Sequence, residues 1–171
     1  VRCFPGTVLI EGTTLSEGRG TTRPLEVMGA SDIDAESIHK EMLRLSKKWM
    51  EGCFVRDCFF EPTFHKHAHK LCSGIQIHVD YKNFDPKKFK PFRLTVLFLK
   101  ALRNLYPDYN LWKKPPYEYE NEKMPIDLIC GSSLIREWVD DKNSRVADLE
   151  KTLKEHESRW RKTQKKYQLY K

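Results

Sequence analysis

The chain has 171 residues, a 39% hydrophobic and 12% aromatic composition, and a formal net charge of +7. These values exclude a disordered chain, suit one domain with its own core, and leave no apolar segment long enough to span a membrane. Residues 142–171 alone carry a net charge of +6, from ten Lys/Arg and four Asp/Glu, and no nucleic-acid module accompanies them, so we expect a solvated basic helix face and no nucleic-acid binding.

The N-terminal third predicts two extended segments joined by a polar loop. "TVLIE" (7–11) predicts a strand that leads into the loop at 11–24, and "LEVMG" (25–29) predicts an extended segment that leaves it. Ser31 and Asp34 form an S-x-x-D helix start signal. Apolar residues then recur at helical spacing, which predicts a helix ending near Gly52: Ile38, Met42, Leu45 and Trp49.

The remaining elements alternate between strand and helix patterns. Residues 53–62 are rich in aromatic and β-branched residues and predict a strand. In "GIQIHVDY" (74–81), aliphatic and polar residues alternate, which predicts a second strand with Gln76 and His78 on the face opposite the core.

A nearly all-apolar stretch predicts the most buried helix at 89–105. Residues 115–125 predict a surface connection, and short helices should follow at 126–130 and 132–140. The spacing of Val146, Leu149, Leu153, His156 and Trp160 predicts an amphipathic terminal helix. The expected fold is a single mixed α+β domain, with a mixed sheet flanked by helices.

The first residues and the cysteines bear on the extent of the chain and on its thiols. The first residues contain no signal peptide and no initiating Met, so we expect this chain to be part of a longer protein. The five cysteines are odd in number and form no C-x-x-C pair. We expect free, mostly buried thiols.

The loop "EGTTLSEGRGTTRP" (11–24) is the main candidate site. Its glycines lack the spacing of a Walker or dinucleotide loop, and no helix follows directly, which excludes a phosphate cradle. Glu11, Glu17 and Arg19 could hold a polyhydroxylated sugar, with hydroxyls from Ser16 and Thr21. The composition also fits a rigid structural loop in which Glu17 and Arg19 pair with each other.

The segment "TFHKHAHKLC" (63–72) contains three histidines at alternating positions. A zinc site on a helix would need the H-E-x-x-H pattern, which is absent, and Lys66 and Lys70 add positive charge beside any cation. We therefore expect no metal here, but one functional histidine, His67, and two incidental exposed ones.

Four blocks of the chain resemble the NamZ family of exo-β-N-acetylmuramidases, long catalogued as a domain of unknown function. They are "PGTVLIEGTTLSEGRGTTRPLE", "FEPTFHKHAHKLCSGIQIHV", "ALRNLYPDYNLW" and the ending "YQLYK". Together they span residues 4–170, and the block "EGT-x-x-SEGRGTT" is highly specific. The resemblance covers the family's C-terminal α/β half, residues 1–171 here. It implies that an N-terminal Rossmann-like half, absent from this sequence, is the partner across a substrate cleft.

The resemblance implies hydrolysis of N-acetylmuramic acid from the non-reducing ends of peptidoglycan fragments, without a cofactor, in the cell envelope or outside the cell. Glu11 and Glu17 are its catalytic candidates within this chain. The implied substrate-binding residues are Ser16, Arg19, Gly20, Thr21, Thr63, Lys66, His67, Gln76 and His78. The alternative is a stand-alone, non-catalytic peptidoglycan-binding or auxiliary module, which would use the same residues.

Overall fold

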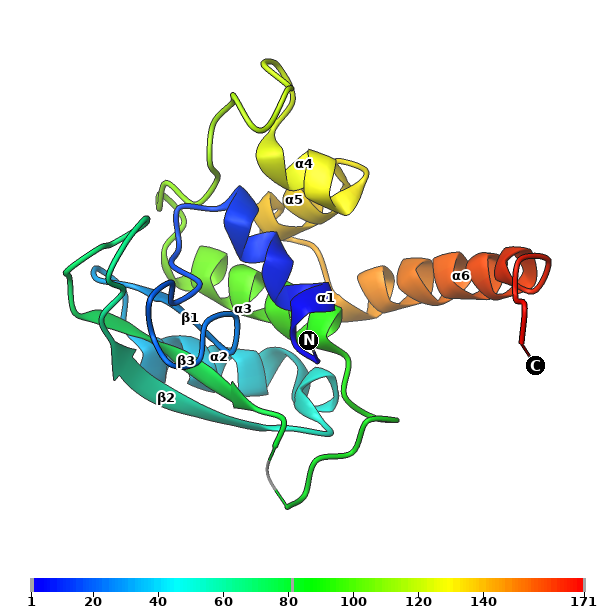
Figure 1. The fold of residues 1–171 in the computed structure, drawn as a ribbon, viewed down its shortest axis with the longest axis horizontal. Helices are drawn as coiled ribbons and strands as arrows, with labels where there is room; N and C mark the ends of the chain where they lie inside the picture. The colour runs from blue at the N-terminus through cyan, green and yellow to red at the C-terminus, as the bar shows by residue number, and fades with distance from the viewer. Residues whose placement is uncertain (1, 81, 171) are drawn as a thin grey trace. The chain divides into compact units, whose positions relative to one another are not determined.

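The computed structural model describes residues 2–80 and 82–170, and the chain divides into two compact units, Val1–Asp140 and Asp141–Lys171. The first unit contains a three-stranded sheet and most of the helices (Figure 1). The mixed α+β class is therefore confirmed. The strands lie in the order β1-β3-β2 and all pairs among them are antiparallel, so the expectation of a mixed sheet was wrong.

The sheet consists of β1 (Val27–Ala30), β2 (Phe54–Phe60) and β3 (Cys72–His78). The alternation predicted for β3 is confirmed, because Ile75 and Ile77 are fully buried. The predicted strand extended to Tyr81, which lies outside the described residues. On β2, Val55 lies opposite Ile77 and adds to the same apolar face.

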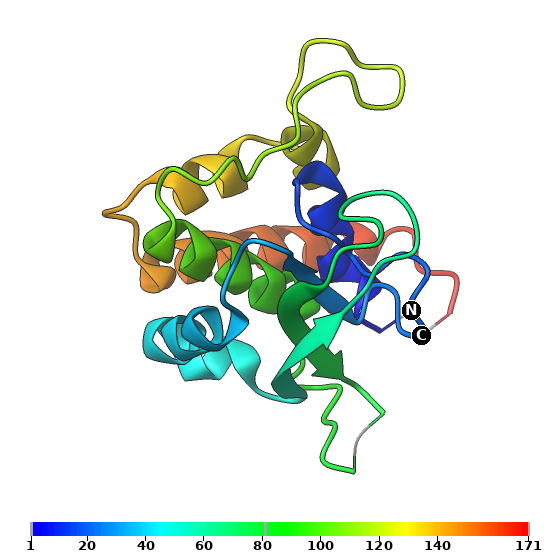
Figure 2. The same cartoon turned by 90° about the vertical axis from the view of Figure 1, so that its left-hand side faces the viewer.

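Helix α2 (Ala35–Ser46) packs on β2 and β3 and also contacts α3 (Figures 1 and 2). It begins at Asp34, whose carboxylate accepts hydrogen bonds from the backbone N–H groups of Glu36 and Ser37, as an N-cap should. Ser31 does not cap the helix. The predicted helix ends in a 3₁₀ turn, η2 (Lys47–Met50), which buries Trp49.

Helix α3 (Pro91–Leu105) is the central helix, as its apolar sequence predicts, and its residues 93–102 are all buried. It begins at a proline, which suits the first helical position, and ends before Pro107. The short helices α4 (Pro125–Cys130) and α5 (Leu134–Asp140) follow close to the predicted positions, and α5 packs on α3.

The N-terminal segment is helical, so the predicted strand at 7–11 was wrong. Helix α1 (Phe4–Thr7) continues into the 3₁₀ helix η1 (Val8–Gly12). Gly6 explains the difference, because α1 packs directly on α3 there, and an added Cβ would lie 2.2 Å from the backbone of Pro91. The helical turn also buries both Leu9 and Ile10, which a strand would place on opposite faces. Tertiary packing therefore overrides the β-branched local sequence.

The second unit contains α6 (Val146–Gln164), the predicted terminal helix. Among the described residues, no helix combines the length and the apolar character that crossing a membrane would require. All five cysteines are free. Burial raises the pKa values of Cys3, Cys53 and Cys130 to about 12, so these thiols stay protonated and unreactive at neutral pH.

Candidate active site

Three segments that are distant in sequence form one open cavity of about 570 Å³, a size typical of small-ligand sites. They are the end of η1 with the loop after it, the loop between β2 and β3, and the connection that precedes α4 (Figure 2). The cavity is lined by Glu11, Thr13, Thr14, Glu17, Arg19, His65, Lys66, His67, Lys113, Pro116, Tyr117 and Glu118. Charged side chains of both signs therefore converge on a single pocket.

Glu17 is the buried anion of this pocket, and its side chain is only 2% exposed. Its Oε1 accepts a short hydrogen bond from Nε of Arg19, and its Oε2 lies 2.8 Å from Nζ of Lys66. Burial is the largest influence on its pKa and opposes ionisation. The charge and hydrogen bonds of Lys66, together with Arg19, outweigh burial, so the pKa of Glu17 is lowered and the group is a carboxylate at neutral pH.

Lys66 joins Glu17 to the backbone at the end of η1. Its ammonium donates to the carbonyl oxygens of Ile10, at 2.7 Å, and Thr13, at 3.2 Å. The same ammonium forms an ion pair with Oε2 of Glu17. Burial lowers the pKa of Lys66, and Glu17 opposes that change. Lys66 is therefore held by two backbone carbonyls and one buried counter-charge.

Glu11 is the more accessible carboxylate, with 27% of its side chain exposed. Nη2 of Arg19 donates to its Oε1 at 3.0 Å, and the hydroxyl of Tyr117 donates to its Oε2 at 3.3 Å. Burial, and then the charge of Glu11, raise the pKa of Tyr117, so the phenol remains a donor. The arrangement gives Glu11 a fixed orientation while leaving it open to the cavity.

Four of the predicted substrate-binding residues instead shape the loop and do not line the cavity. Ser16 pairs with Gly29 through the backbone in both directions, and the hydroxyl of Thr21 donates to the carbonyl of Gly18. Gly20 has a φ of +82° and lies so close to Thr63 that a Cβ would be 1.7 Å from its hydroxyl oxygen. The glycines thus allow one loop to dock on another.

Gln76 and His78 lie elsewhere, on the face of the sheet away from α2. Gln76 faces Arg56 across the strand pair, and His78 faces Phe54. Arg56 donates to Oε1 of Gln76 at 2.5 Å and to Nε2 of His78 at 3.0 Å. The structure therefore brings five predicted site residues into the cavity, namely Glu11, Glu17, Arg19, Lys66 and His67, and places these two in a separate polar cluster.

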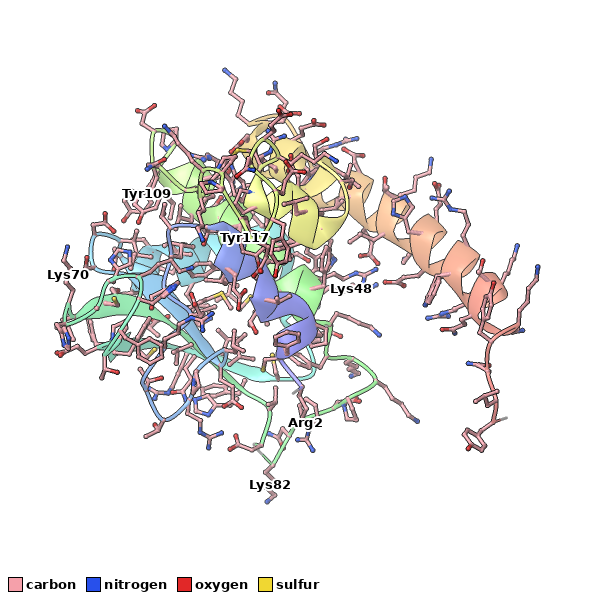
Figure 3. All side chains as sticks on the ribbon, turned by 45° about the horizontal axis from the view of Figure 1, so that its top comes forward. Arg2, Lys48, Lys70, Lys82, Tyr109 and Tyr117 are labelled. Atoms are coloured by element: carbon pink, nitrogen blue, oxygen red, sulfur yellow. The ribbon has the colours of Figure 1, made fainter. Side chains whose placement is uncertain are left out.

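A wall formed by Lys113, Pro116, Tyr117 and Glu118 was not predicted, because residues 115–125 have the composition of a surface connection and no motif marks Lys113. Backbone pairing sets this wall beside the glutamates: Thr13 and Trp112 form an antiparallel bridge, and the N–H of Lys113 donates to the carbonyl of Gly12 at 3.1 Å. Figure 3 shows Tyr117 close to η1. An aromatic residue after two prolines in "PPYEYE" was the one available signal.

The histidine segment forms an irregular turn in which all three histidines have positive φ values: His65, His67 and His69. The ring of His67 bridges two segments, since its Nδ1 lies 3.0 Å from the hydroxyl of Ser31 and its Nε2 lies 3.2 Å from the carbonyl of Thr14. His65 and His69 are exposed as expected, and His65 also lines the cavity.

We predict that this histidine segment binds no structural metal. His67 is already bonded to two other segments, and a metal site needs several converging, deprotonated ligands. Elemental analysis of protein purified without added metal should show far less than one zinc per chain. Stoichiometric zinc that disappears in His67→Ala would contradict the prediction.

Replacing Lys66 by Met should destabilise the first unit strongly. The substitution leaves the buried carboxylate of Glu17 with Arg19 alone and removes the donor shared by Ile10 and Thr13. Breaking a buried ion pair typically costs about 3–5 kcal/mol, which should lower the urea midpoint clearly. Lys40→Met is the matched control, because Lys40 pairs with Glu36 on an exposed helix face. Equal midpoints for the two variants would show that Lys66 does not hold the loop.

Comparisons with known proteins agree with this architecture. A family model described as the C-terminal part of the exo-β-N-acetylmuramidase NamZ matches residues 2–170. The chain is 33% identical over 170 residues to the peptidoglycan β-N-acetylmuramidase NamZ of Bacillus subtilis (strain 168), covering 98% of this chain and 36% of that protein. It therefore spans about a third of the length of this curated relative.

Two solved structures share the fold. A DUF1343 family protein of Bacteroides fragilis NCTC 9343 matches with a TM-score of 0.67 and 21% identity, covering 99% of this chain and 42% of that one. A second DUF1343 family protein of the same organism matches with a TM-score of 0.60 and 20% identity, covering 99% and 40%. The family match over nearly the whole chain and the identity to the Bacillus protein decide the assignment: the chain belongs to the family of NamZ C-terminal domains.

Proposed function

We propose that this chain forms one wall of the substrate cleft of an exo-β-N-acetylmuramidase, with N-acetylmuramic acid bound in the cavity around Glu11. The observation that carries the proposal is the pairing of a buried, ionised Glu17 with an accessible Glu11 through the same arginine. The name of the Bacillus relative supplies the reaction class. A Rossmann-like half of the same protein would form the opposite wall.

Glycoside hydrolysis requires a proton for the leaving oxygen and a group that directs water or stabilises the positive charge on the sugar ring. Glu11 can exchange a proton, because it faces the cavity and Tyr117 and Arg19 fix its orientation. Glu17 cannot serve as an acid, since Lys66 and Arg19 keep it ionised. We assign to Glu17 a fixed negative charge that orients Arg19 and stabilises the developing oxocarbenium ion.

We infer that the second proton-handling group comes from outside this chain. Within the cavity, the described carboxylates are Glu11, Glu17 and the exposed Glu118, which lies on the outer connection. Catalysis therefore depends on a partner half that supplies a carboxyl or comparable group on the other side of the anomeric carbon.

The test is release of N-acetylmuramic acid from a chromogenic β-N-acetylmuramide by a two-domain protein that carries this chain. We expect turnover by the two-domain protein and its loss when this chain is deleted. Specific binding of peptidoglycan fragments by the two-domain protein, without turnover, would overturn the proposal in favour of a non-catalytic binding module.

A further inference from the structure

The cations of the cavity are not equally available to a ligand. Arg19 donates to both Glu17 and Glu11, and Lys66 donates to two backbone carbonyls and pairs with the charge of Glu17. The charges of Glu11, Glu17, Arg19 and Lys66 sum to zero. A ligand that brings its own negative charge therefore needs a further cation, because an unpaired charge in a partly dehydrated site is costly.

Lys113 is that further cation. It lines the same cavity, and its ammonium forms no ion pair within the part of the chain that the structure describes. Its Nζ lies 5.3 Å above the centre of the Tyr117 ring, a cation–π geometry that keeps the charge at the cavity wall while leaving its N–H donors unoccupied. Glu118 also lines the cavity, but it is exposed and forms no ion pair with a described residue.

The position of Lys113 is fixed by the backbone. Its N–H donates to the carbonyl of Gly12, directly after Glu11, and the preceding residue, Trp112, bridges to Thr13. The hydroxyl of Tyr117, whose ring lies under the ammonium, is bonded to Glu11. Lys113 and Glu11 are therefore held on the same side of the cavity by two independent connections.

We propose that Lys113 determines specificity by binding the carboxylate of the lactyl ether on N-acetylmuramic acid. This inference rests on the proposed function and goes beyond it by naming the residue that recognises the acid. N-Acetylglucosamine lacks the lactyl group, so a site that discriminates between the two sugars needs a cation placed for that carboxylate. A charge-assisted hydrogen bond of this kind changes affinity by roughly 10- to 100-fold.

The experiment compares two substrates of the two-domain protein: a chromogenic β-N-acetylmuramide with a free lactyl carboxylate, and its methyl ester. For wild type, kcat/KM should favour the acid. In Lys113→Met the ratio of kcat/KM for the acid to kcat/KM for the ester should fall at least tenfold, mainly because KM for the acid rises. Lys113→Arg should recover most of this ratio. Lys114→Met is the matched control, because Lys114 lies outside this cavity, and its ratio should equal that of wild type.

Two outcomes would overturn the inference: an unchanged ratio in Lys113→Met, or an equal loss for acid and ester, which would indicate a structural role. Calorimetric binding of N-acetylmuramic acid and N-acetylglucosamine to the same two-domain protein separates this inference from the proposed function. If wild type binds N-acetylmuramic acid more tightly than N-acetylglucosamine and Lys113→Met abolishes that difference, the role of Lys113 is supported even if the protein shows no turnover. Equal affinity for both sugars in wild type contradicts the inference whatever the activity.

Discussion

Replacing Glu11 by Gln in a two-domain protein that carries this chain is expected to lower kcat/KM by about 30- to 1000-fold with little loss of stability. That range corresponds to about 2–4 kcal/mol of transition-state stabilisation. Glutamine keeps the size and the acceptor oxygen of Glu11 but cannot exchange a proton. Because the ion pair with Arg19 is partly exposed, the stability cost should stay below about 1 kcal/mol.

Glu17→Gln is the informative comparison, since it should lower both activity and stability. The neutral amide would leave the buried ammonium of Lys66 without a counter-charge. The pKa of Glu17 is lowered from 4.5 in the folded protein, so its stabilising contribution is complete above that value and is lost as the pH falls through the lower, folded value. Urea midpoints measured from pH 7 to pH 3 should therefore fall less steeply in Glu17→Gln than in wild type.

The opposite pattern of activity losses would exchange the roles assigned to Glu11 and Glu17. Near-wild-type turnover in Glu11→Gln, with a large loss confined to Glu17→Gln at unchanged stability, would make Glu17 the proton-handling group. Arg19→Ala, which contacts both carboxylates, should lower kcat/KM by a similar factor in either case. Near-wild-type turnover in all three variants would make the loop a scaffold and contradict the site assignment.

The sequence predicted those elements whose pattern is local. The alternation of Ile75 and Ile77, the apolar helix over 89–105 and the periodic helix after Asp34 all depend on near neighbours, and all appear in the structure. The helical form of η1 could not be predicted, because it depends on how Gly6 packs against Pro91 of α3. The antiparallel order of the sheet is likewise a long-range property, set by how β1 and β2 flank β3.

The candidate site likewise combines residues that a local sequence pattern identifies with residues that only long-range packing brings together. The loop sequence identified Glu11, Glu17 and Arg19, because close charged residues between glycines are visible in a linear sequence. Lys113 and Tyr117 reach the cavity only through the backbone pairing of Trp112 with Thr13, which no local pattern encodes. Conversely, Gln76 and His78 were grouped with the loop by resemblance, whereas strand register pairs them with Arg56 and Phe54.

The 171-residue chain on its own is expected to fold but not to hydrolyse muramyl glycosides at a measurable rate. It should fold because α3, buried along residues 93–102, joins α1, α2 and α5 in one core, and α2 closes the apolar face of the sheet. A single cooperative urea transition followed by circular dichroism would show this. A chain without such a transition would mean that the core needs the partner half.

Inactivity should follow from the open cavity. Hydrolysis needs two groups fixed on opposite sides of one anomeric carbon, in a site that excludes bulk water. Here Glu11 and Arg19 remain 27% and 35% exposed, so water would screen their contacts with a sugar. Binding of N-acetylmuramic acid at about millimolar affinity should persist, and NMR shifts should map it to Glu11, Arg19, Lys113 and Tyr117. Turnover by the chain alone that disappears in Glu11→Gln would contradict this prediction, because both proton-handling groups would then have to lie within these 171 residues.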